Sequence, residues 1–179
     1  LKEWNSKGYF TYAGRRNEGE AKFYSGECAM LTSSSAAQAN INRNAKFKYA
    51  VGMLPYYADV AGAPRNTIIG GASLWVMSGK KPNDYKGVAK FLSYLADPQR
   101  QAQWHQQTGY LPITPVAYDI TKQSGFYDKN PGTDISVRQM TLNQPAPFTR
   151  GLRFGSMPQI RDVIEEEMEN MLAGKQDAK

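Results

Sequence analysis

Short apolar segments, each stopped by glycine or proline, alternate along this chain with longer amphipathic stretches. Cys28–Leu31 and Tyr49–Leu54 are predicted strands, the second ended by Pro55. Thr67–Met77 is predicted to form two strand pieces broken at Gly70–Gly71. Strands mixed with more numerous helices are typical of α/β or α+β proteins, so the alternation restricts the fold to these classes.

Apolar spacing and capping residues mark the helices. Apolar side chains recur at helical spacing between Val88 and Leu95, after a start near Asp84. Asp97-Pro98 supplies an N-cap and a first-turn proline for the next helix, which Gly109 ends. Further helices are predicted over residues 36–43, 116–122, 134–142 and, with Ser156 as its cap and Gly174 as its end, the final amphipathic stretch.

Composition limits the class of partner. The 179 residues suffice for one or two modest domains, and no apolar run approaches the roughly 20 residues that cross a bilayer. We expect no signal peptide at Leu1, where charged residues follow at once. A net charge of +6 favours anionic partners, but the basic residues are scattered. Nucleic-acid binding usually needs a basic stripe, so we expect no nucleic acid as partner.

The chain lacks the residues that common catalytic and metal sites use. Cys28 and His105 are its only cysteine and histidine, so no internal disulfide, metal cluster or cofactor is expected. Cys28 is interpreted as a small hydrophobe in a buried strand, and His105 as a surface or partly packed residue. The acidic group Glu165–Glu169 is interpreted as a solvated helix face. We therefore do not expect an enzyme.

Anion capture by hydroxyl, amide and guanidinium groups is the chemistry that remains. Ser33, Ser34 and Ser35 lie between a predicted strand and a helix start, where unpaired N–H groups attract anions. The alternative is that one serine only caps the helix. Gly71 can bring a backbone amide close to a ligand, although, taken alone, a turn or bulge is the stronger explanation of this glycine.

Two further residues offer groups for a ligand. Tyr110 follows the helix-ending Gly109, and its ring and hydroxyl are candidates for the lining of a cleft. Arg161 lies in the first turns of the final helix, beside its apolar face, and matches the bidentate geometry of a phosphate. A salt bridge from Arg161 to Asp162 or another carboxylate is the alternative.

These same stretches carry a family resemblance. Phe23–Ser35 resembles the F-x-x-G-x-A-A-M segment of extracellular solute-binding proteins of the maltose-binding-protein type. Gly70–Ser78, Asp97-Pro98 and Thr108–Pro112 continue the pattern in order, and Gly151–Arg161 resembles the members of this family that bind glycerol-3-phosphate. The resemblance covers essentially the whole chain.

The resemblance implies an α/β fold of two lobes, the type II periplasmic-binding-protein fold, of which this chain is the C-terminal portion. Residues 1–52 would form part of the C-terminal lobe, residues 53–111 the hinge crossing and part of the N-terminal lobe, and residues 112–179 the return to the C-terminal lobe. The protein would be periplasmic and monomeric, without a cofactor, and would deliver its ligand to the membrane permease subunits of an ABC importer.

The resemblance also implies the ligand and its contacts. Glycerol-3-phosphate or a glycerophosphodiester such as glycerophosphocholine would bind Ser34, Gly71, Tyr110 and Arg161. Ser34 is our choice among the three serines, and the sequence does not rank monoester against diester ligands. Because family members are longer and share the pocket between lobes, this chain alone is expected to bind weakly. A phosphohydrolase-type enzyme and a basic nucleic-acid-binding domain stay open as alternatives.

Overall fold

The computed structural model describes residues 1–177, and within that range every regular element is helical. The chain forms two compact units: Leu1–Leu31 joins the residues from Leu152 onward in one unit, and Thr32–Gly151 forms the other. The helices are α1 (Lys2–Ser6), α2 (Glu20–Tyr24), α3 (Ala37–Asn44), α4 (Pro82–Leu95), α5 (Pro98–Thr108), α6 (Pro115–Gln123), α7 (Phe126–Lys129), α8 (Ile135–Met140), the 3-10 turn η1 (Pro147–Thr149) and α9 (Met157–Leu172).

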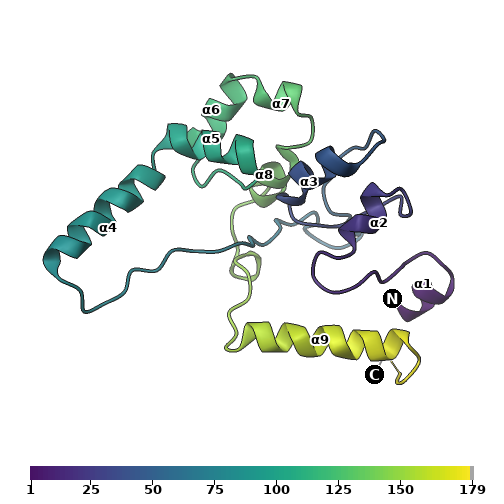
Figure 1. Ribbon diagram of the computed structural model, residues 1–179. Coiled ribbons are helices and arrows are strands. Elements are labelled where there is room, and N and C mark those ends of the chain that lie inside the picture. The colour runs from purple at the N-terminus through teal and green to yellow at the C-terminus, as the bar shows by residue number, and fades with distance from the viewer. Residues whose placement is uncertain (178–179) are drawn as a thin grey trace. The chain divides into compact units, whose positions relative to one another are not determined.

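Small side chains let α5 and α6 pack closely in the unit Thr32–Gly151. Ala102 of α5 is 2% exposed, and Ala117 and Thr121 of α6 are fully buried. The Thr121 hydroxyl donates to the Ala117 carbonyl at 2.9 Å, so its burial leaves no polar group unsatisfied. Figure 1 shows α5, α6 and α7 grouped together. This helical group supports the candidate site.

Local signals predicted these helices well. Asp97 caps α5 by accepting a hydrogen bond from the Arg100 N–H at 3.0 Å, and Gly109 ends the helix in the left-handed conformation. The predicted helices over residues 36–43, 116–122 and 134–142 are confirmed as α3, α6 and α8. Each lies within a few residues of its predicted bounds, because caps and prolines act over one turn.

The start of α9 corrects one prediction. Ser156 occupies the N-cap position, but its backbone is left-handed (φ 55°) and its side chain makes no capping hydrogen bond. The first turn of α9 is therefore begun by Met157 and Pro158 rather than by a serine cap. The far end agrees better: Gly174 adopts φ 74° just after the helix.

The predicted strands Cys28–Leu31, Tyr49–Leu54 and Thr67–Met77 are wrong as secondary structure for the part of the chain that the structure describes. A strand exists only where its backbone pairs with a neighbouring strand, and these segments run without such a ladder. In Thr67–Met77 the apolar side chains are largely exposed, with Trp75 at 85%. Figure 1 draws the stretch leading into α4 as a long unpaired segment. Apolar patterning thus identified strand-like sequence but supplied no pairing partner.

The end of Thr67–Met77 is held by α4. The Tyr85 hydroxyl donates to the Met77 carbonyl and accepts from the Lys80 N–H, both at 3.1 Å. The apolar face of α4, which includes Phe91, lines a groove with Leu74–Met77. The spacing that predicted an amphipathic helix is therefore confirmed, and its apolar face lies toward this segment.

Candidate ligand-binding site

The serines before α3 present a hydroxyl at a helix start. Ser34 is exposed, and its Oγ accepts a hydrogen bond from the Ala36 N–H at 3.3 Å. Ala36, not a serine, occupies the N-cap position of α3 and makes no side-chain capping hydrogen bond. The Ser34 hydroxyl thus satisfies an N–H at this helix start, and the Ser34 carbonyl accepts from the Ala37 N–H at 3.0 Å, so the capping alternative stands for Ser34, whose side chain is also exposed to solvent.

The end of α5 lies against the start of α3. A Cβ placed on Gly109 would lie 3.1 Å from the Ser35 carbonyl oxygen and 3.5 Å from the Ala36 Cα. Gly109 thus needs to be glycine for its left-handed backbone (φ 77°) and for this close approach. The next residue, Tyr110, is 51% exposed. Two of the predicted ligand-binding residues, Ser34 and Tyr110, consequently sit beside the same helix junction.

His105 lies beneath Tyr110 and is only 2% exposed, so its interpretation as a surface or partly packed residue is wrong. Its Nδ1 lies 2.6 Å from the Tyr110 carbonyl oxygen, and its Nε2 lies 3.0 Å from the Tyr127 hydroxyl. A carbonyl only accepts, so Nδ1 carries the proton and Nε2 accepts from Tyr127. The Phe126 ring packs edge-on against the imidazole at 6.0 Å.

Electrostatics agree with this arrangement of neutral rings. Burial lowers the pKa of His105, an effect partly opposed by the hydrogen bond to Tyr110. Burial is also the main cause of the raised pKa of Tyr127. The imidazole therefore stays neutral and the phenol stays protonated at neutral pH. Both ring nitrogens are occupied, which leaves His105 without a free position to act as a general base.

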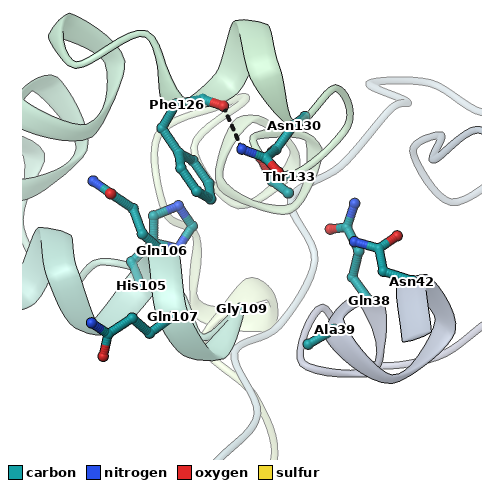
Figure 2. Close-up of a pocket in the computed structure, with 10 residues that line it drawn as sticks. All are labelled: Gln38, Ala39, Asn42, His105, Gln106, Gln107, Gly109, Phe126, Asn130 and Thr133. Carbon is teal, nitrogen blue, oxygen red and sulfur yellow. Dashed lines mark hydrogen bonds between the residues drawn. The ribbon is translucent and has the colours of Figure 1, made fainter.

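A small polar cavity opens between α3, α5 and the α7 region, as Figure 2 shows. Its volume is about 100 Å³, and no charged side chain lines it. The Asn130 amide donates to the Phe126 carbonyl at 2.9 Å on one wall. Neutral amides suit hydroxyls or water rather than a phosphate, which needs a compensating positive charge. The lining residues are Gln38, Ala39, Asn42, His105, Gln106, Gln107, Gly109, Phe126, Asn130 and Thr133.

Gly71 lies on the exposed segment that leads to α4. Its φ is 108°, and no atom lies within 4 Å of the position that a side chain would occupy. The backbone at Gly71 is thus open to close approach by a ligand. Of the two alternatives, a β-bulge does not apply, because no strand forms in this part of the described chain, whereas the chain does bend at Gly71, as a turn requires.

Arg161 lies in the second turn of α9, in the other unit from Ser34, Gly71 and Tyr110. Its side chain is exposed, and its guanidinium makes no hydrogen bond or ion pair with any residue between 1 and 177. The alternative partner, Asp162, instead lies 3.7 Å from the Arg16 guanidinium. None of the four predicted residues hydrogen-bonds to another within the described range.

A charge cluster that the sequence patterns missed anchors the N-terminal segment to α9. Arg15 donates two hydrogen bonds to the Glu169 carboxylate, at 2.8 and 2.6 Å, and the Tyr12 hydroxyl donates a third at 2.8 Å. The Arg15 hydrogen bond, followed by that of Tyr12, lowers the pKa of Glu169 to about 2. Burial and the bond to Glu169 raise the pKa of Tyr12 to about 12. Glu169 is therefore not part of a merely solvated face, as the sequence interpretation had it.

Other chemistry has little support within residues 1–177. No group of three or more His, Cys, Asp or Glu side chains is placed to hold a metal ion there. Cys28 is a free, partly exposed thiol in a different unit from His105. No described helix has the length and apolar character needed to cross a membrane.

Comparison with known proteins identifies the family. Residues 1–133 match the family described as bacterial extracellular solute-binding protein. Over 98% of its length the chain is 59% identical to the sn-glycerol-3-phosphate-binding periplasmic protein UgpB of Salmonella typhimurium, of which it covers 40%. The same identity and coverage of the chain hold for UgpB of Pectobacterium atrosepticum, of which it covers 39%.

A solved structure supports the fold. UgpB from Mycobacterium tuberculosis in complex with glycerophosphocholine aligns with 98% of this chain and 42% of its own, at a TM-score of 0.77 and 24% sequence identity. The predicted type II periplasmic-binding-protein fold is thereby confirmed, with only partial lobes present and no paired strands in the described part. On the family match, the chain belongs to the bacterial extracellular solute-binding proteins.

Proposed function

We propose that this chain is the C-terminal portion of the periplasmic substrate-binding component of an ABC importer. Its ligand would be glycerol-3-phosphate or a glycerophosphodiester such as glycerophosphocholine, which it delivers to membrane permease subunits as a monomer. The single observation that carries this proposal is the 59% identity, over 98% of the chain, to proteins named for binding sn-glycerol-3-phosphate in the periplasm.

Four residues of this chain would contact the ligand. The Ser34 hydroxyl, the Gly71 amide and the Tyr110 side chain supply hydrogen bonds, and the Arg161 guanidinium pairs with the phosphate. Three observations support them: Ser34 and Tyr110 flank one helix junction, Gly71 is open on its side-chain side, and Arg161 has no partner between residues 1 and 177.

The ligand would lie between two lobes of the complete protein. In this proposal residues 1–52 and 112–179 belong to the C-terminal lobe, and residues 53–111 cross the hinge and enter the N-terminal lobe. The chain spans 40% of the length of the Salmonella relative, so the remaining ligand contacts would come from outside it. Calorimetry on the 179 residues is expected to show weak or undetectable binding beside the full-length protein.

Arg161→Ala in the full-length protein tests the assignment. Removing the charged partner of a bound phosphate is expected to weaken binding of glycerol-3-phosphate by about 2–5 kcal/mol. Arg43→Ala, which removes the same charge from an exposed position on α3, controls for the general field and should change affinity little. An Arg161→Ala affinity within a few-fold of the parent protein, measured by calorimetry, would refute the assignment.

Incubating the full-length protein with glycerol-3-phosphate distinguishes ligand binding from phosphate hydrolysis. A binding protein returns glycerol-3-phosphate unchanged, since His105 has both ring nitrogens engaged and is not free to act as a base. Incubation followed by an assay of inorganic phosphate should show no release. Steady turnover would favour the phosphohydrolase alternative, and salt-dependent retention of duplex DNA on a filter would favour the nucleic-acid alternative.

A further inference from the structure

The backbone of Tyr110 is held on both sides by side chains of α5. The Tyr110 N–H donates to the Thr108 hydroxyl oxygen at 3.3 Å, and its carbonyl accepts from His105 Nδ1 at 2.6 Å. Gly109, just before it, ends α5 in the left-handed conformation with φ 77°. With both backbone groups fixed, the direction in which the Tyr110 side chain leaves the chain is fixed as well, although its ring is 51% exposed.

His105 is itself immobilised from the opposite side. Its Nε2 lies 3.0 Å from the Tyr127 hydroxyl, and the Tyr127 ring centroid is 5.7 Å from that of the imidazole. Tyr127 in turn packs on Tyr118 of α6 at 5.3 Å. A chain of contacts between the buried His105 and the partly exposed Tyr127 and Tyr118 thus connects the helical group α5–α7 to a carbonyl beside an exposed tyrosine. Such supporting contacts hold a ligand-binding side chain in its productive geometry.

We propose that His105 is a positioning residue for ligand binding: through its Nδ1–H it fixes the backbone of Tyr110 and so orients the Tyr110 side chain toward the ligand. This inference rests on the proposed function, because it requires Tyr110 to contact the bound molecule. His105 does not touch the ligand in this proposal. Its effect on affinity is therefore transmitted through Tyr110 alone.

Two amide substitutions separate the two hydrogen bonds of His105. The amide nitrogen of asparagine occupies the place of Nδ1, so His105→Asn retains a donor for the Tyr110 carbonyl. Glutamine reaches the place of Nε2, so His105→Gln keeps the contact with Tyr127 and loses the one with Tyr110. Binding of glycerol-3-phosphate to the full-length protein, by calorimetry, should fall about tenfold for His105→Gln and stay within about threefold for His105→Asn.

A double-mutant cycle distinguishes positioning from general destabilisation. Tyr110→Ala should weaken binding, and in that background His105→Gln should have almost no further effect on affinity, because the side chain it orients is gone. A His105→Gln loss that persists in the Tyr110→Ala background would overturn the inference and assign His105 a general structural role. Unchanged affinity in His105→Gln, with weakened binding in Tyr110→Ala, would overturn the inference and leave the proposed function standing.

Two further outcomes complete the test. If Tyr110→Ala binds as tightly as the parent protein, the assignment of Tyr110 fails and the inference fails with it, whereas Arg161→Ala still tests the proposed function. If His105→Gln does not fold, Thr108→Val removes the acceptor for the Tyr110 N–H at a partly exposed position. That variant should lose affinity in the parent background and not in Tyr110→Ala; no loss in the parent background would contradict the inference.

Discussion

Gly109→Ala measures how tightly the junction between α3 and α5 is packed. An alanine at φ 77° adopts the left-handed conformation, which costs about 1 kcal/mol of stability. Its Cβ would also lie 3.1 Å from the Ser35 carbonyl oxygen, a rigid backbone atom, so the start of α3 has to shift. Overpacking of this kind costs about 1–2 kcal/mol more. We expect a total loss of about 2–3 kcal/mol from these two terms.

Gly79→Ala is the matched control, because Gly79 has φ 75° and no atom within 4 Å of its side-chain position. It carries the conformational cost alone and should lose about 1 kcal/mol. Urea unfolding of both variants gives the difference, which isolates the contact with Ser35. Equal losses in the two variants would refute the reasoning that the α3–α5 junction is close-packed. In the full-length protein only Gly109→Ala should also weaken ligand binding, because Ser34 and Tyr110 flank it.

Three further predictions concern buried or paired groups. The pKa of Glu169 is lowered from 4.5 to about 2, so its pairing with Arg15 stabilises the fold above pH 4.5, and this stability is lost as pH falls toward 2. Glu169→Gln should therefore flatten the dependence of the free energy of unfolding on pH in this acid range, measured by urea unfolding. An unchanged pH dependence would contradict the pairing. Burial lowers the pKa of His105 below 6.5, so the folded state loses stability as pH falls below 6.5. His105→Asn should remove this loss of stability from the pH profile of unfolding. If the loss persists in His105→Asn, it belongs to another titrating group. Gln139→Leu removes the side-chain oxygen that accepts the Leu54 N–H at 2.9 Å and should lower the free energy of unfolding by about 1–3 kcal/mol. Hydrogen exchange should show the Leu54 amide exchanging faster. An unchanged exchange rate would show that water replaces the contact.

Helices were predictable from the sequence because their signals act within one turn. The Asp97 cap, the Gly109 end and the spacing from Val88 to Leu95 each specify local backbone geometry without any distant partner. The strand-like segment Thr67–Met77 differs, since its structure depends on a neighbouring strand that its own residues cannot supply. A pattern of apolar residues therefore specified where a strand can form, and pairing decides whether it does.

The candidate site was predictable in part for a related reason. The motifs that carry the family resemblance, taken in order, indicated Ser34, Gly71, Tyr110 and Arg161. The convergence of these residues on one ligand remains a prediction. His105 was misjudged because its second partner, Tyr127, lies 22 residues away. Arg15 and Glu169 were missed because 154 residues separate them. One signal in the sequence could have indicated the role of His105. This residue lies one helical turn before Gly109, a position from which a side chain can reach the backbone that follows the helix end.

The surroundings of Arg161 leave its guanidinium, which we propose binds the ligand, without a protein partner among the described residues. An exposed arginine in the second turn of a helix is ordinarily paired with a carboxylate three or four residues along the same face. Asp162 is the adjacent candidate, yet its carboxylate lies 3.7 Å from the Arg16 guanidinium, while Glu165, one turn further along α9, accepts a hydrogen bond from the Arg16 N–H at 3.3 Å. The N-terminal segment thus engages two carboxylates of α9 that would otherwise compete with a ligand for the guanidinium. In the proposed function an anionic phosphate supplies the missing negative charge, so the interaction that compensates Arg161 forms only when the ligand binds.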